Sequence, residues 1–258
     1  MKPEHELILE FLCWGVQVFT RRDLGLTLSG YRPTATDRRI DELLERLRQQ
    51  RLLEKEGRGR YARFTITAAG QQQVRTFDPA AHWNQPWDAK WRVFTFDFPA
   101  NRHKDRILLW RALRNHKFGL LQRSVWIWPH MVTSILEGIV QAQGIPECFC
   151  GFEAGHVFLC DNAEIIVAAW DFEEIARRHS TYLNNGVATT GNLARARDLR
   201  ELARLTRIER DAFHYAFSRD PLLPRELWPK GYKGPALHER RLAFHAQLRR
   251  RLREFANV

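Results

Sequence analysis

The chain has 258 residues, of which 44% are hydrophobic, and its 41 Lys and Arg residues against 30 Asp and Glu residues give a net charge of +11. The length predicts more than one domain, and the apolar content excludes an intrinsically disordered chain. No run of about 18 apolar residues is present, and Glu4 and Glu6 precede the apolar part of the opening sequence, unlike the layout of a secretory signal. We therefore expect no membrane span and a cytoplasmic location.

The basic charge is unevenly distributed along the chain. Residues 1–80 contain 14 basic and 11 acidic residues (+3), residues 81–165 contain 9 and 8 (+1), and residues 166–258 contain 18 and 11 (+7). A basic total predicts a polyanionic partner, although most of the excess lies far from residues 34–67.

Residues 1–80 have the pattern of a winged helix-turn-helix domain. Apolar residues at helical spacing predict helices over residues 4–15, 20–28 and 35–50, and the last of these buries Ile40, Leu43, Leu44 and Leu47. Residues 52–67 then change to the period of two strands around the tip Gly57-Arg58-Gly59-Arg60. A helix followed by a basic hairpin predicts a recognition helix and a wing.

Arginines on this predicted helix and wing are the candidate DNA contacts. Those on the helix are placed to reach base edges or phosphates, and those on the wing to reach phosphates or the minor groove. Glu42 and Glu45 oppose this reading, and a winged helix used only for protein contacts, or a merely solvated helix face, stays open as an alternative. The candidates are Arg38, Arg39, Arg46, Arg58, Arg60 and Arg63.

Residues 87–161, after a boundary near residues 80–86 with Pro79 and Pro86 on either side, alternate between strand and helix patterns. The order is βαβαββ, or βαββαβ if the segment 119–128 bends into two strands, and it predicts a ferredoxin-like α+β domain. The predicted elements are strands at 91–98 and 119–128, helices at 104–116 and 131–143, and short strands at 148–152 and 156–160.

Three of the four cysteines, Cys148, Cys150 and Cys160, fall within this domain, and Cys13 lies in the first one. Their C-x-C-x9-C spacing does not match the paired C-x2-4-C pattern of zinc sites. We therefore favour free thiols over a metal site.

Residues 162–258 are predicted to form a mainly helical domain, with helices at 163–183, 193–217 and 236–255 and a proline-rich loop at 220–235. Arginines along it are suited to pair with the phosphates of an anionic effector, while contact with flanking DNA and simple solvation are the alternatives. The candidate effector-binding residues are Arg200, Arg204, Arg207, Trp228 and Tyr232.

Two stretches of the sequence resemble the PaaX-type transcriptional repressors, which control phenylacetic acid degradation. The central stretch contains Trp87-Asp88, Phe96-Asp97-Phe98-Pro99 and Ser124-Val125-Trp126, and the more specific C-terminal stretch is RDPLLPRELWP at 219–229. The resemblance implies a winged helix, a central dimerisation domain similar to the small CRISPR adaptation nucleases, and a helical C-terminal domain. It also implies a homodimeric repressor, not an enzyme, that binds a palindromic operator and is released by a CoA thioester such as phenylacetyl-CoA.

Asp97 permits a second hypothesis. In the nucleases that the central domain resembles, an acid at this place in each subunit helps to hold Mg²⁺ at the dimer axis. The alternative function is therefore a Mg²⁺-dependent nuclease with Asp97 as the metal ligand. An Asp two residues before a proline more often caps a turn, so we expect no metal cofactor.

Overall fold

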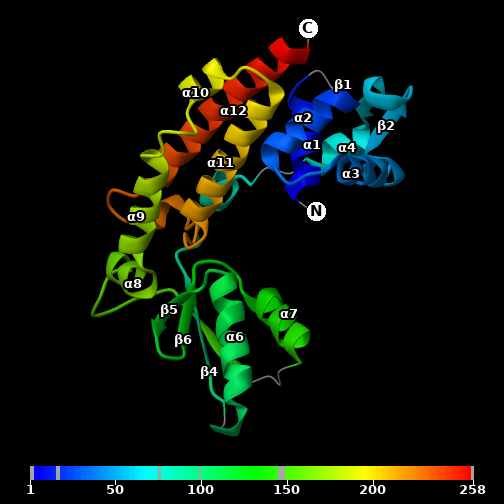
Figure 1. Ribbon diagram of the computed structural model, residues 1–258. Helices are drawn as coiled ribbons and strands as arrows, with labels where there is room; N and C mark the ends of the chain where they lie inside the picture. The colour runs from blue at the N-terminus through cyan, green and yellow to red at the C-terminus, as the bar shows by residue number, and fades with distance from the viewer. Residues whose placement is uncertain (1–2, 16–17, 75–76, 99, 145–148, 257–258) are drawn as a thin grey trace. The chain divides into compact units, whose positions relative to one another are not determined.

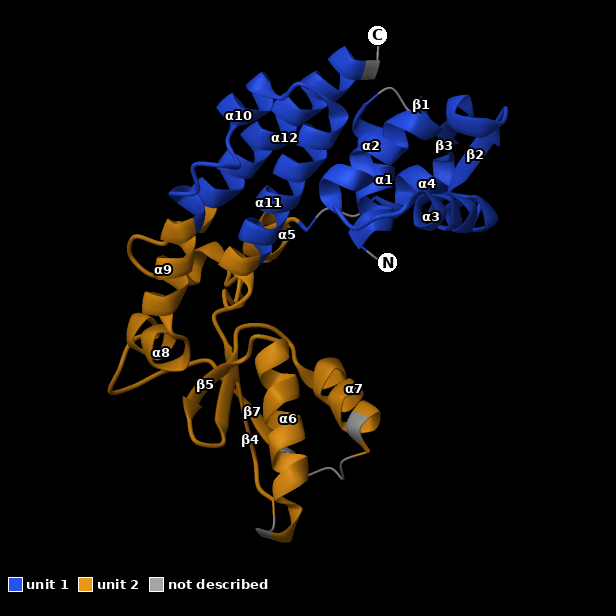
Figure 2. Cartoon of the chain, in the orientation of Figure 1, with its two compact units in different colours: residues 1–77, 182–214, 236–258 blue, residues 78–181, 215–235 orange. Residues whose placement is uncertain are grey.

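The computed structural model describes residues 3–15, 18–74, 77–98, 100–144 and 149–256. They form two compact units that are interleaved along the chain (Figure 2). Unit 1 comprises residues 1–77, 182–214 and 236–258, and unit 2 comprises residues 78–181 and 215–235. The sequence predicts three consecutive segments instead, with boundaries at 1–80, 87–161 and 162–258. That division stays a prediction about which parts fold alone, because the units record only which parts are packed together.

The N-terminal part of unit 1 alternates helices with the strands of a small antiparallel sheet (Figure 1). The sheet has the order β1-β3-β2, so the hairpin β2–β3 is extended by β1, with Phe19 opposite Phe64. The elements are α1 (Pro3–Trp14), β1 (Val18–Thr20), α2 (Arg21–Tyr31), α3 (Asp37–Gln49), β2 (Leu53–Glu56), the 3₁₀ turn η1 (Gly59–Tyr61), β3 (Arg63–Ile66) and α4 (Ala68–Gln73).

Local sequence signals fix the starts of α2 and α3. Thr20 and Asp23 form a reciprocal capping box at the start of α2, and the Thr36 hydroxyl accepts the amide of Arg39 at the start of α3. In α3, Ile40, Leu44 and Leu47 are buried as the spacing predicts, and Leu43 is half-buried. The helix predicted at 35–50 is therefore confirmed to within two residues at its start.

Two helices from the C-terminal third complete unit 1. They are α11 (Leu199–Phe217), whose last residues belong to unit 2, and α12 (Gly234–Ala256), which begins in unit 2; the short α10 (Thr190–Arg195) precedes them. Leu202 and Leu205 of α11 and Leu248 of α12 share one continuous core with the apolar residues of α1, α2 and α3. The N-terminal elements and these helices thus exclude water from the same interior.

A buried ion pair joins these two parts of unit 1. Arg210 of α11 donates to the Glu10 carboxylate of α1, and both side chains are more than nine-tenths buried. Burial raises the pKa of Glu10, and the charges of Arg210 and Arg241 oppose that rise. Tyr31 of α2 lies beside the same guanidinium, with its hydroxyl 3.5 Å from Arg210 Nη1.

Unit 2 contains a four-stranded antiparallel sheet with the order β5-β6-β4-β7. The connectivity is βαββαβ with both helices packed on one face, which is the ferredoxin-like arrangement. The segment 119–128 forms two strands rather than one, since it turns at Arg123, and residues 156–160 form no strand. The elements are α5 (Pro79–Trp83), β4 (Trp91–Phe96), η2 (Ala100–Arg102), α6 (His103–Asn115), β5 (Gly119–Gln122), β6 (Val125–Trp128), α7 (Thr133–Gln143) and β7 (Phe149–Ala154).

The two faces of this sheet have separate cores because alternate residues of a strand point to opposite sides. Phe94 and Phe96 of β4 pack with α6 and α7, whereas Trp91 packs with Ile165 and Ile166 of α8 (Asn162–Ala169). Gly119 of β5 faces α8, and a Cβ there would lie 2.7–2.8 Å from Trp170 and Ala169. The absence of a side chain at Gly119 therefore permits this close approach.

The predicted helix 163–183 is two helices, α8 and α9 (Phe172–Leu183), because the chain is extended at Trp170. The predicted helix 193–217 is likewise divided between α10 and α11. The loop 218–233, with the 3₁₀ turn η3 (Arg225–Leu227), is fixed by the buried Asp220, which accepts bonds from the Leu222 amide at 2.7 Å and the Tyr232 hydroxyl at 2.7 Å. No helix in the described ranges is long and apolar enough to cross a membrane.

Gly30 provides a test of the packing of α2 on α11. A Cβ at this position would lie 2.0 Å from the backbone oxygen of Arg200, so Gly30→Ala must separate the two helices. We expect the free energy of unfolding in urea to fall by about 1–3 kcal/mol, as overpacked cores do. Gly25→Ala in the same helix is the control, because its nearest neighbour is the flexible end of the Arg21 side chain. Equal stability of the two variants would contradict this packing.

His245 provides a test that uses pH. Burial and the nearby Arg241, Arg249 and Arg210 lower the pKa of this imidazole to about 3. Its depressed pKa means that the unfolded chain takes up a proton below about pH 6.5 while the folded chain does not, so stability falls as pH falls. Between pH 7 and 5 we expect a loss of about 2 kcal/mol that His245→Gln removes. Urea unfolding at both pH values measures this loss, and the exposed His103→Gln is the control; a wild-type pH dependence in His245→Gln would refute the prediction.

Candidate nucleic-acid interface

A groove in unit 1 lies among α2, α3 and the β2–β3 hairpin, and residues of all three line it. Its floor contains apolar side chains such as Leu26, Ile40 and Phe64. Its cationic side chains come from three separate parts of the sequence: Arg21 and Arg22 open α2, Lys55 and Arg60 belong to the hairpin region, and Arg200 lies in α11.

The acids of this groove are paired within it. Arg21 Nε lies 2.5 Å from Asp41 Oδ1, and its Nη2 lies 3.3 Å from Asp37 Oδ1. Arg21 also donates to the backbone oxygen of Asp37, so it attaches the first turn of α3 to the start of α2. Arg21 holds both Asp37 and Asp41, and the five cations of the lining against these two acids leave the groove with a net positive charge, which suits phosphate.

The exposed face of α3 is internally compensated in a similar way. Arg38 pairs with Glu42 at 2.9 Å, and Arg48 pairs with Glu45 at 2.6 Å. The hydrogen bond from Arg48 lowers the pKa of Glu45, which keeps this acid ionised and engaged. Arg39 and Arg46 are exposed, and neither forms an ion pair with any residue that the structure describes. They are therefore the α3 arginines that a ligand reaches without first breaking an ion pair.

The hairpin tip projects further arginines into solvent. Arg58, Arg60 and Arg63 are all exposed. Gly57 and Gly59 have φ angles of +80° and +67°, a conformation that side chains disfavour, so the tip requires glycine at both positions. Arg60 stacks on the ring of Tyr61 at 4.7 Å and donates to its hydroxyl at 2.6 Å, which presents an aromatic face and a cation together.

The six arginines predicted from sequence thus lie on α3 and on the hairpin, as expected, and their role in binding stays a prediction. The helix and wing patterns do not single out Arg21, Arg22 and Lys55. Arg21 and Arg22 carry a detectable signal, because they form a pair of arginines directly after the N-cap residue Thr20 of the helix that precedes α3. The sequence assigns Arg200 to a different ligand, since its distance along the chain hides its place in this groove.

The five predicted effector-binding residues lie in different units. Arg204 is exposed on α11, and Arg207 lies 3.9 Å from Asp211. Trp228 and Tyr232 belong to unit 2, where both pack against the ring of Trp83. Trp228 Nε1 donates to the Leu223 oxygen at 3.0 Å, so these aromatic side chains support the loop 218–233. Their assignment to an effector stays a prediction.

Asp97 lies at the end of β4, and its side chain is 98% exposed. Its Oδ1 accepts the amide of Phe98 at 2.8 Å and lies 3.6 Å from Arg106 Nη2. No group of three or more potential metal ligands occurs among the described residues. Cys13, Cys150 and Cys160 are free thiols there, and Cys148 lies outside the described residues.

Comparison with known protein families identifies the central domain. Residues 84–166 match the family model described as the PaaX protein central Cas2-like domain. Among solved structures, the chain is similar to an uncharacterized protein, Rv0674 from Mycobacterium tuberculosis, with a TM-score of 0.53 and 16% sequence identity over 85% of this chain and 84% of that one. At this identity the likeness concerns the fold alone. No curated protein matches the chain.

Proposed function

Because this chain belongs to the PaaX-type family of transcriptional regulators, we propose that it is a dimeric repressor that binds a palindromic operator. The N-terminal elements of unit 1 act as a winged helix-turn-helix, with α3 in the major groove and the β2–β3 hairpin as the wing. The central ferredoxin-like domain joins two copies. An acyl-CoA-type molecule, such as phenylacetyl-CoA, releases the repressor from DNA.

The groove among α2, α3 and the hairpin is the observation that carries this proposal. It contains five cations against two acids, and both acids are held by Arg21. In a winged helix the recognition helix and the wing lie on the DNA side, so phosphates of one strand pass between them. Arg39 and Arg46, together with Arg22 and Arg60, then meet DNA without first losing an ion pair.

The ligand-dependent part of the proposal is a shift between two arrangements of the dimer. An effector that binds the arrangement with wrongly spaced recognition helices more tightly lowers the affinity for a palindromic site. The test is binding of the protein to its own upstream DNA, with and without CoA thioesters, at several salt concentrations. Absence of sequence-selective binding at moderate salt would exclude the proposal. We do not propose the nuclease, because the described residues contain no group of three or more potential metal ligands and the hypothesis would depend on a dimer axis beside Asp97.

A substitution at Arg200 tests whether the DNA-binding surface includes a residue of α11 or only the N-terminal elements. If Arg200 contacts a phosphate, Arg200→Ala should lower the slope of log affinity against log salt by about 1, and it should weaken all DNA sequences alike. Fluorescence anisotropy on operator and scrambled duplexes measures both effects. Arg204→Ala is the matched control, because Arg204 is an exposed arginine of the same helix that does not line the groove. An equal loss in the two variants would mean that only overall charge matters.

The α3 arginines should behave differently. Replacing both Arg38 and Arg39 by alanine should reduce discrimination between operator and scrambled DNA, by about 1–3 kcal/mol for each arginine that reads a base edge. Arg58→Ala on the hairpin should instead weaken binding to both duplexes equally, as removal of a phosphate-binding arginine does. The same anisotropy titrations give both ratios. Unchanged discrimination in the α3 variant would show that α3 does not read bases.

A further inference from the structure

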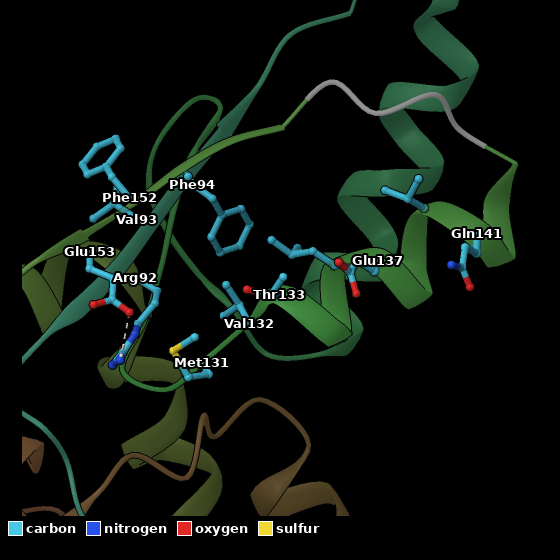
Figure 3. Close-up of a pocket in the computed structure, with 13 residues that line it drawn as sticks. Arg92, Val93, Phe94, Met131, Val132, Thr133, Glu137, Gln141, Phe152 and Glu153 are labelled. Atoms are coloured by element: carbon cyan, nitrogen blue, oxygen red, sulfur yellow. Dashed lines mark hydrogen bonds and ion pairs between the residues drawn. The ribbon is translucent and has the colours of Figure 1, made fainter.

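A cavity of about 370 Å³ in the central domain lies between α7 and the sheet (Figure 3). Gly151 lies opposite Phe94 in the register of β7 and β4, and it lines the cavity without a side chain to fill it. Arg92 is the only cation among the described residues that line this cavity, and it is already bound to Asp88 at 2.6 Å and to Glu153 at 3.3 Å. The cavity therefore offers no free cation to a ligand. A reactive group of a different kind lies in the loop after α9.

The loop between α9 and α10 (Figure 1) contains Asn185-Gly186, which is the one Asn-Gly pair in the sequence. In such a pair the backbone nitrogen of the glycine can attack the carboxamide carbon of the asparagine and close a five-membered ring. Glycine favours this reaction because it has no side chain to obstruct the attack and because its backbone turns freely. Whether the pair reacts in a folded protein depends on how the fold holds the atoms involved.

The side chain of Asn185 is folded over the backbone that follows it. Its Oδ1 accepts the amide of Val187 at 3.0 Å and the amide of Ala188 at 3.3 Å. Both donors lie beyond Gly186 in the chain, so these bonds draw the carboxamide carbon forward, toward the Gly186 nitrogen. Two backbone N–H groups on one carbonyl oxygen also stabilise the negative charge that develops there when a nucleophile adds to the carbonyl carbon.

The nucleophile and the leaving group of this reaction are not held. The Gly186 N–H and the Asn185 Nδ2 donate to no acceptor in the part of the chain that the structure describes. Gly186 is exposed, and a Cβ there would meet nothing within 4 Å, so solvent reaches its amide. Asn192 of α10 shows the contrast, because its Nδ2 donates to the backbone oxygens of Gly186 and Val187 at 2.9 and 2.6 Å and the buried Leu193 follows it.

We propose that Asn185-Gly186 is a self-modifying site, at which the folded chain converts Asn185 into isoaspartate through a succinimide. The Gly186 nitrogen loses its proton to solvent and bonds to Asn185 Cγ, while Nδ2 takes up a proton and leaves as ammonia. Water then opens the ring. Its oxygen bonds to the backbone carbonyl carbon of Asn185, the bond from that carbon to the Gly186 nitrogen breaks, and a hydrogen of the water goes to the nitrogen. The net change is the loss of one ammonia and the gain of one water, so no oxidant or reductant is required.

Arg240 of α12 selects the carbonyl at which the ring opens. Its Nη2 lies 2.5 Å from the backbone oxygen of Asn185, and its guanidinium also binds the backbone oxygens of Leu183 and Ala188. A cation on this oxygen polarises the carbonyl carbon more strongly than neutral amides polarise Cγ. Opening at this carbon turns the same oxygen into part of the isoaspartate carboxylate, which stays beside Arg240 as an ion pair. The product has one more negative charge and one more backbone bond in the loop.

Ageing of the full chain at neutral pH tests the proposal without DNA. Mass spectrometry of peptides from protein kept in heavy-oxygen water measures the modified fraction, and electron-transfer dissociation distinguishes isoaspartate from aspartate. We expect Asn185 to react several-fold faster in the folded protein than in guanidinium chloride, because unfolding removes the two donors on Oδ1. Asn192 is the internal control and should stay unmodified in the folded protein. An equal or slower reaction of Asn185 in the folded protein would overturn the proposal.

Two variants separate the steps. Gly186→Ala fits without displacing a neighbour, so its melting temperature should match that of the wild type, yet the methyl group beside the attacking nitrogen should slow the reaction several-fold. Gly191→Ala, which makes only an ordinary contact, is the matched control and should react like the wild type. Arg240→Gln should lower the ratio of isoaspartate to aspartate several-fold, and the unfolded wild type, in which Arg240 has left the loop, gives an independent measure of that ratio. Equal rates in Gly186→Ala and the wild type overturn the site, and a ratio that is the same in the folded and unfolded wild type overturns the role of Arg240.

Discussion

The ion pair between Arg210 and Glu10 is the constraint on which the organisation of unit 1 depends. Both groups are buried, so removing one partner would leave an uncompensated charge in the core, at a cost of about 3–5 kcal/mol. The pair joins α11 to α1, and Tyr31 of α2 lies against the same guanidinium. Because a buried charge tolerates few positions of its partner, it fixes which face of α11 meets the N-terminal helices.

This connection changes how the basic charge of the chain is interpreted. Along the sequence, the +3 of residues 1–80 and the +7 of residues 166–258 belong to different predicted domains. Unit 1 brings part of both together, since Arg200 lines a groove with Arg21, Arg22 and Arg60. The direct backbone approach at Gly30 holds the Arg200 end of α11 in that place. A surface assembled in this way draws its positive charge from both the N-terminal and the C-terminal parts of the sequence.

In unit 2 the stretch RDPLLPRELWP has a structural role that can be read atom by atom. Asp220 is fully buried, lies 3.0 Å from His179 Nε2 and accepts the Tyr232 hydroxyl, so one carboxylate links α9 to both ends of the loop 218–233. Leu222 has a φ of +57°, which is costly for a residue other than glycine, and its amide donates to Asp220. Three contacts of this one buried carboxylate, to the Leu222 amide, the Tyr232 hydroxyl and His179, hold the stretch in its conformation.

Local features could be predicted from the amino-acid sequence: the capped starts of α2 and α3, the buried stripe of α3, the glycine-dependent hairpin tip, and the mixed strand and helix order of the central domain. These follow from period, capping and turn chemistry, which act over a few residues. The differences in the described part are also local. The helix predicted at 163–183 breaks after Trp170, where the Asp171 carboxylate accepts the amide of Glu174 and begins a new helix. The polar turn at Arg123 selects the βαββαβ alternative over βαβαββ. Contacts between residues far apart in the sequence could be seen only in the folded molecule. They are Arg210 with Glu10, Arg200 with the groove, and Gly151 with Phe94. Pairings of this kind depend on the packing of whole elements, and no spacing along the chain encodes them.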